Sequence, residues 1–94
     1  MVTWDHQVRP HPEVVDTVLD TGDTVLLQLE SKTYYSLNVT GTQIWQGLKQ
    51  GLPLPEISRQ LQARFAVEPE RADRSVLALV EDLLQHQLVQ YVEP

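Results

Sequence analysis

The sequence contains no cysteine, and this absence excludes several kinds of site at once. Without a thiol, the chain can form no disulfide, no thiolate zinc site and no cysteine nucleophile. A lack of cysteine suits a cytoplasmic protein, which is the location we expect. Residues 1–12 are polar and lack the apolar segment of a secretory signal peptide.

Long apolar runs are also missing from the sequence. A membrane-spanning helix needs about 20 consecutive, mostly apolar residues. No segment approaches that length, so we expect no membrane-bound form.

Basic residues are few, since 7 Lys and Arg stand against 13 Asp and Glu and give a net charge of −6. Six acidic residues lie in the first third: Asp5, Glu13, Asp16, Asp20, Asp23 and Glu30. Binding to a nucleic-acid duplex depends largely on Lys and Arg that neutralise phosphates. The composition therefore disfavours nucleic acid as a partner and favours a protein, a basic peptide or a small molecule. Solubility explains the acidic surface equally well.

A chain of 94 residues is expected to form one domain with a modest core. Residues 1–13 are predicted to form an extended arm, because Pro10 and Pro12 block a regular helix. We expect a short edge strand around residues 3–8, with Trp4 anchoring the arm. The domain itself is predicted to cover residues 14–94.

Three strands are predicted at the start of this domain, over residues 14–20, 24–29 and 33–37. Short turns join them, so they should form an antiparallel meander. In the second strand, Val25, Leu27 and Leu29 predict the apolar face, and Leu26 should cover the other face. If the third strand lies at an edge, it offers unpaired backbone N–H and C=O groups.

Three helices are predicted next, over residues 39–50, 54–65 and 69–87, with residues 89–92 as a terminal strand or extension. Two caps fit the first helix: Asn38 directly, or a capping box from Thr40 to Gln43. Gly47 inside that helix would allow close packing. Strands followed by helices predict an α+β domain of the winged helix-turn-helix type.

The junction between the third strand and the first helix carries the pattern Tyr34-Tyr35-x-Leu37-Asn38-x-x-Gly41-x-x-Ile44-Trp45. This pattern, with the order of the elements from about Val14 to Val89, resembles the PqqD-like family. These are leader-recognition domains for ribosomally made, modified peptides, and they include small leader-binding proteins of lasso-peptide clusters. The resemblance implies a winged-helix fold and a non-catalytic role in which the protein presents a precursor leader peptide to a modifying enzyme or a leader peptidase. A lasso-type pathway fits best, because the segment from Pro55 to Ala72 looks most like those small proteins.

In that family the leader adds as a strand to the third strand and lies against the third helix. On this chain the resemblance implies a binding site formed by Thr33, Tyr34, Tyr35, Ser36, Leu37, Ser75, Leu79, Asp82 and Leu83. Tyr34 and Tyr35 point to opposite faces of the strand, so one belongs to the core and the other covers the sheet or touches the peptide. The wide apolar face of the third helix has two explanations, because its residues are either all core or partly line the groove.

Two departures from the family pattern bear on the site and on the end of the third helix. Ser75 stands where the family often has Asp, so Asp82 would have to take over the pairing with a basic leader residue. Gln87 stands where a Gly usually ends the third helix. Because a left-handed conformation would cost Gln87 about 1 kcal/mol, we expect this helix to end differently.

Other functions have weaker support in the sequence. His6, His11 and His86 are scattered and suggest neither a catalytic set nor a metal site, so we expect no enzyme activity, metal or cofactor. A winged-helix DNA-binding protein is one alternative, supported only by Arg71 and Arg74. A structural subunit that pairs through its edge strand is another, and the chain is expected to be a monomer or a homodimer.

Overall fold

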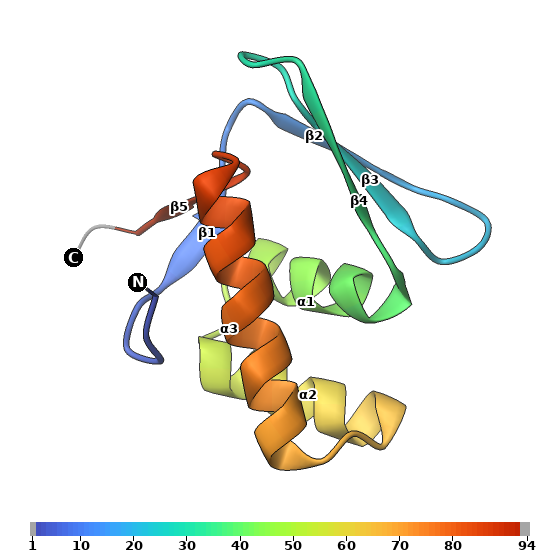
Figure 1. Cartoon of the computed structure of the whole chain (residues 1–94), viewed down its shortest axis with the longest axis vertical. Coiled ribbons are helices and arrows are strands. Elements are labelled where there is room, and N and C mark those ends of the chain that lie inside the picture. The colour runs from blue at the N-terminus through green and yellow to red at the C-terminus, as the bar shows by residue number, and fades with distance from the viewer. Residues whose placement is uncertain (1, 93–94) are drawn as a thin grey trace.

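Five strands and three helices make up residues 2–92, the part of the chain that the computed structural model describes (Figure 1). Positions 1, 93 and 94, at the outer ends of the predicted arm and domain, lie outside the described residues. The elements are β1 (Val8–Pro10), β2 (Val14–Val18), β3 (Thr24–Gln28), β4 (Thr33–Leu37), α1 (Val39–Lys49), α2 (Leu54–Phe65), α3 (Pro69–Gln85) and β5 (Val89–Tyr91).

Strands β2, β3 and β4 form one antiparallel sheet in that order. The register pairs Val18 with Thr24 at one hairpin and Gln28 with Thr33 at the other. The predicted meander is therefore confirmed, and β4 is an edge strand. The predicted α+β architecture, with this sheet followed by three helices, is confirmed as well.

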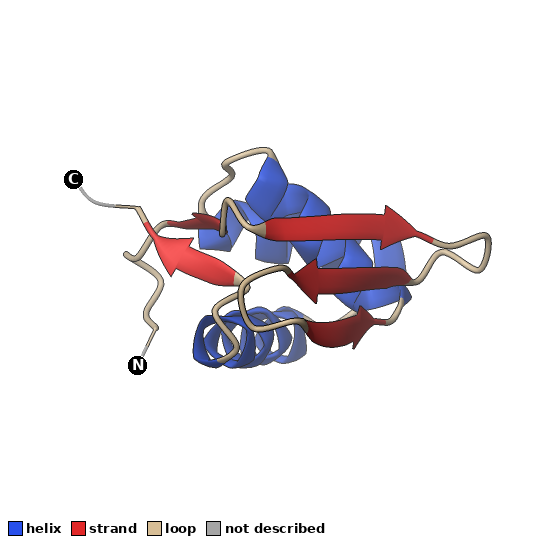
Figure 2. Ribbon diagram, turned by 90° about the horizontal axis from the view of Figure 1, so that it is seen from above, coloured by secondary structure: helices blue, strands red, loops and turns tan. Residues whose placement is uncertain are grey.

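The face of β3 that meets the helices is the opposite of the predicted one. Leu26 is fully buried, whereas Leu29 is 44% exposed and Val25 and Leu27 are only half-buried. Thr24 and Gln28 are buried on the same side as Leu26. Figure 2 shows why: the helices lie on one face of the sheet and leave the other face uncovered. The apolar residues on that uncovered face misled the prediction.

Asn38 caps α1, which resolves the choice between the two predicted caps. Its side-chain oxygen accepts a hydrogen bond of 2.8 Å from the Gly41 N–H. Trp45 and Ile44 on α1 are buried in the core, and α1 packs against both β3 and β4. A Cβ built on Gly47 would lie 2.7 Å from Cγ1 of Ile57, so glycine is what allows α1 and α2 to come this close.

Residues 2–13 are tied to the segment that follows α3. Strand β1 pairs antiparallel with β5, with Val8 opposite Tyr91 and Pro10 opposite Val89. The arm thus contains a strand, but at Val8–Pro10 rather than at residues 3–8. Val2 and Val8 are both buried in the core. The arm also keeps Trp4 half-buried against that core.

Helix α3 ends with Gln87 in the left-handed conformation, at φ 58°. The expectation that this helix would end differently is wrong. Two backbone hydrogen bonds close the end, from Gln87 N to Leu84 O (3.1 Å) and from Leu88 N to Leu83 O (2.9 Å). The Gln87 carbonyl also accepts a bond of 2.8 Å from the buried Gln28 side chain. These bonds offset the strain that a non-glycine residue carries there.

Candidate functional site: the open edge of β4 and the groove beside α3

The hydrogen-bond pattern of the sheet shows which backbone groups of β3 point toward which neighbour. Leu29 N donates to Glu13 O, and Leu19 N donates to Asp23 O, at the two ends of the β2–β3 pair. Bonded and non-bonded residue pairs alternate along an antiparallel ladder. The odd-numbered residues of β3 therefore direct their N–H and C=O groups toward β2, and the even-numbered ones direct theirs toward β4.

The same alternation identifies the free backbone groups of β4. Tyr35 stands opposite Leu26, so the odd-numbered residues of β4 form the ladder with β3. Tyr34 and Ser36 then direct their N–H and C=O groups outward, at the open edge. An extended peptide laid along this edge would find a donor and an acceptor at each of these two residues.

A groove runs between this edge and α3. Its volume is about 320 Å³, and it is lined by Tyr35, Ser36, Leu37, Asn38, Thr40, Gly41, Ile44, Ser75 and Leu79. The lining residues come from β4, from the first turns of α1 and from one face of α3. None of these side chains is charged. A strand added to β4 would direct every second side chain into this groove.

A hydrogen bond joins β4 and α3 beside the groove. The Tyr35 hydroxyl donates to the Asp82 carboxylate, and the ring of His86 packs edge-on against Tyr35 with centroids 5.4 Å apart. Burial, and then the bond to the Asp82 carboxylate and its charge, raise the pKa of Tyr35 to about 12. The phenol therefore stays protonated as a donor at neutral pH. Asp82 itself stays partly open to solvent, with 44% of its side chain exposed.

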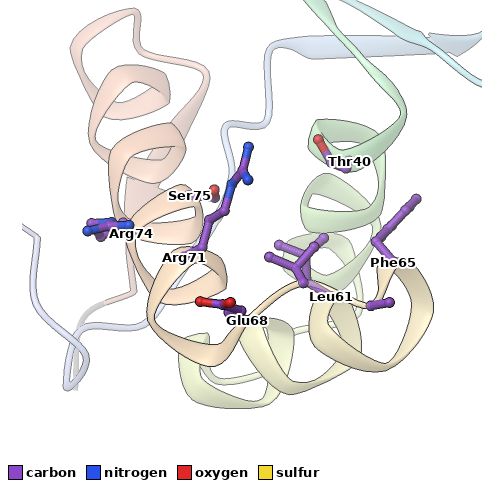
Figure 3. Close-up of a pocket in the computed structure, with 9 residues that line it drawn as sticks. Thr40, Leu61, Phe65, Glu68, Arg71, Arg74 and Ser75 are labelled. Carbon is purple, nitrogen blue, oxygen red and sulfur yellow. The ribbon is translucent and has the colours of Figure 1, made fainter.

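Two further depressions adjoin the groove along α3. One has a volume of about 680 Å³ and is lined by Thr40, Leu61, Phe65, Ala66, Val67, Glu68, Arg71, Arg74 and Ser75. In Figure 3 the Arg71 side chain extends from α3 toward Thr40 on α1. The other is lined by Ser75, Ala78, Leu79, Glu81, Asp82 and Gln85. Ser75 lines all three hollows, so they form one continuous surface.

The structure brings together most of the residues predicted from the sequence. Tyr35, Ser36 and Leu37 face Ser75 and Leu79 across the groove. Thr33 begins β4, and Asp82 joins the site through Tyr35.

Tyr34 and Leu83 are placed differently from these residues. The side chain of Tyr34 is 71% exposed on the sheet face that turns away from the helices, so only its backbone faces the edge. Leu83 is fully buried in the core. Leu83 therefore has no surface with which to touch a bound peptide, and its predicted role in the site is wrong.

Several residues that line the hollows were not assigned to the site from the sequence, among them Thr40, Ile44, Arg71 and Glu81. A helical pattern was available for one of them, because Arg71, Ser75, Leu79 and Asp82 follow one another at spacings of four, four and three. Residues at these spacings lie on one side of a helix. No sequence pattern indicated that Thr40 and Ile44 of α1 line the groove, because this depends on how α1 packs against β4.

Neither a membrane span nor a metal site emerges from residues 2–92. No helix among them combines the length and the apolarity that crossing a bilayer requires. No group of three His, Asp or Glu side chains in this range lies close enough to hold a metal ion. His6 and His11 each accept a 3.0 Å hydrogen bond at Nδ1 from a nearby backbone N–H, of Thr3 and Glu13 respectively.

Comparison with known proteins identifies a family and two similar structures. A family profile described as coenzyme PQQ synthesis protein D (PqqD) matches residues 23–89. A structure of TbiB1 in complex with the TbiA(beta) leader peptide is 26% identical, with a TM-score of 0.83 over 92% of this chain and 99% of that one. A lasso peptide synthetase B1 complexed with the leader peptide is 31% identical, with a TM-score of 0.81 over 89% and 98% of the two chains. No curated protein sequence matches.

Proposed function

The chain belongs to the PqqD family, and on this basis we propose that it is a non-catalytic protein that binds the leader segment of a precursor peptide. The leader adds as a strand to β4, pairs with the backbone of Tyr34 and Ser36, and lies in the groove beside α3. The observation that carries the proposal is the coincidence of the open edge with that groove. Both similar structures were solved with a leader peptide bound, which supports the proposal.

The bound leader is presented to a partner, which is a modifying enzyme or a leader peptidase. Holding the leader turns the encounter between the rest of the precursor and that enzyme into an intramolecular event. The gain is one of effective concentration and requires no chemistry from this chain. The likeness to a lasso peptide synthetase B1 supports a lasso-type partner.

The test is a titration followed by backbone amide NMR. The ligands are synthetic peptides that correspond to the short open reading frames beside the gene. Saturable shifts at Tyr34 and Ser36 and along α3 are expected for the cognate leader. If no neighbouring peptide shifts these amides, the proposal fails, and self-association through β4 becomes the alternative to examine by light scattering.

A pair of substitutions at Ser36 makes this test specific for strand addition. Ser36→Pro removes the outward N–H and leaves the bonds between β4 and β3 in place, because proline is tolerated at an edge. We expect leader binding to weaken at least about tenfold, since a strand-pairing bond is lost and the proline ring blocks the edge. Ser36→Ala, which keeps the N–H, should bind like the parent chain.

Equal binding by Ser36→Pro and Ser36→Ala would contradict strand addition at this edge. Proline at position 35 would be a poor test, because the Tyr35 N–H belongs to the ladder with β3 and its loss would damage the sheet itself.

A further inference from the structure

The peptide surface along α3 carries opposite charges at its two ends. At one end, Arg71 and Arg74 line the larger depression together with a single acid, Glu68. At the other end, Glu81 and Asp82 line the depression near the C-terminal end of α3, and no basic residue lines it. The groove between them is lined by uncharged residues only. A peptide lying along the whole surface would therefore meet a positive region, an uncharged region and a negative region in turn.

The charges at both ends are available to a ligand. Arg71 is exposed, and within residues 2–92 no carboxylate lies in ion-pair distance of it; Arg74 is already 3.8 Å from Glu70. Asp82 uses Oδ2 for the Tyr35 hydroxyl, and its Oδ1 lies 3.6 Å from Nδ1 of His86; no Lys or Arg in that range is its partner, and 44% of its side chain is exposed. Helix α3 also has no basic residue in its last turn, so the negative end of its dipole adds to Glu81 and Asp82.

The separation of the two charges matches a short extended segment. Arg71 and Asp82 are eleven residues apart on α3, which is about 16 Å at the helical rise of about 1.5 Å per residue. An extended strand covers that distance in about five residues. A peptide can therefore place one charged side chain at each end while the residues between them pair with β4.

The direction of the peptide follows from the sheet. Both strand pairs in the sheet are antiparallel, and antiparallel pairing is the more stable per residue. A peptide that runs antiparallel to β4 enters beside Leu37, at the Arg71 end, and leaves beside Thr33, at the Asp82 end. Its earlier residues then meet the arginines and its later residues meet the acids.

From this arrangement we propose that the groove selects extended peptides in which an acidic residue precedes a basic residue by about five positions. Arg71 forms an ion pair with the acidic residue of the peptide, and Asp82 forms one with the basic residue. The proposal rests on the proposed function, because it specifies which peptide the same site accepts.

The test uses three capped peptides of about twelve residues, built from Thr, Ser and Val. One carries Glu followed five positions later by Lys, one carries Lys followed by Glu, and one carries Gln at both positions. Dissociation constants come from amide shifts of Tyr34 and Ser36. We expect the Glu-then-Lys peptide to bind about tenfold more tightly than the reversed one, and this ratio should shrink in high salt, because the pairs are exposed.

Protein variants assign the preference to the two residues. Arg71→Gln and Asp82→Asn should each reduce the tenfold ratio to about threefold, because each removes one of two pairs. The amide oxygen introduced by Asp82→Asn can still accept a bond from the Tyr35 hydroxyl, so that bridge is preserved. Arg9→Gln changes the net charge like Arg71→Gln but lines none of the three hollows, so it should leave the ratio unchanged.

The outcomes separate this inference from the proposed function. Equal binding by all three peptides at Tyr34 and Ser36 would overturn charge selection and still support a peptide site. Preference for the Lys-then-Glu peptide would overturn the inference, since the order is part of it. If none of the three binds while a neighbouring leader does, selection by charge is wrong and the leader-binding function stands. If neither the three peptides nor any leader binds, both proposals fail.

Discussion

Asp16 links the sheet to the first helix through its carboxylate. It lies on β2 and accepts hydrogen bonds from Trp45 Nε1 (2.8 Å) and Lys49 Nζ (2.7 Å). Burial alone would raise the pKa of Asp16, but the two hydrogen bonds and the Lys49 charge outweigh it and lower the pKa overall. Because the folded state has the lower pKa, this carboxylate stabilises the fold above the unfolded value of about 3.9. The contribution is lost as the pH falls through the folded value.

Replacing Asp16 with Asn therefore has two expected effects. At pH 7 the free energy of unfolding should fall by about 1 kcal/mol, because the hydrogen bonds lose their ionic character. Between about pH 5 and pH 2 the variant should lose stability less steeply than the parent chain. Urea unfolding across this pH range measures both. Asp20→Asn, at an exposed turn, is the control, and an acid dependence of Asp16→Asn equal to that of the parent would contradict this role.

At the scale of elements, Gly47 sets the distance between α1 and α2. Ala at this position would gain up to about 1 kcal/mol of helix propensity. The Cβ of that alanine would, however, lie 2.7 Å from Cγ1 of Ile57. Ile57 is buried and β-branched, so its side chain has little room to move away. We expect the overpacking to outweigh the gain in helix propensity, so that Gly47→Ala lowers the free energy of unfolding by about 1–2 kcal/mol in chemical denaturation.

The partner of this contact provides the control for Gly47→Ala. In an Ile57→Ala background the obstructing atoms are absent, so Gly47→Ala should become neutral or stabilising. A stabilising effect of Gly47→Ala in the parent chain would show that the helices can move apart at little cost.

The order and type of the main elements were predictable from the sequence because their signals are local. The turns around Gly22 and Lys32, the cap at Asn38 and the prolines Pro55 and Pro69 mark boundaries that the structure reproduces within two residues. The face of β3 was not predictable in this way. Val25, Leu26 and Leu27 are all apolar, so alternation cannot say which side meets the helices.

The site was only partly predictable for a different reason. Its strand and helix were identified, but the bridge between Tyr35 and Asp82 joins residues 47 positions apart. Arg71 was noticed for its charge and not for its place beside the groove. The left-handed Gln87 was missed because the compensating bond comes from Gln28, 59 residues away. Such contacts depend on packing, which local patterns do not report.

At the scale of the molecule, the N-terminal arm contributes to the core through Val2 and Val8. Val8 is 1% exposed and lies in the strand that pairs with β5. Val8→Ala removes two buried methyl groups, so we expect a loss of about 2 kcal/mol. Thermal unfolding would show it as a lower midpoint. Arg9→Ala, on the exposed neighbour, should stay within about 0.5 kcal/mol of the parent. A loss no larger for Val8→Ala than for Arg9→Ala would show that the arm is dispensable.

The pairing of β1 with β5 also determines how the molecule would respond to mechanical force. Val8 and Tyr91 stand opposite each other at the end of the ladder nearest the two termini. A load applied between the termini would therefore open this short ladder one bond at a time, like a zipper, instead of shearing all its bonds together. The three-stranded sheet and the groove lie outside this line of tension. We expect the ends to part at low force while the peptide surface keeps its shape.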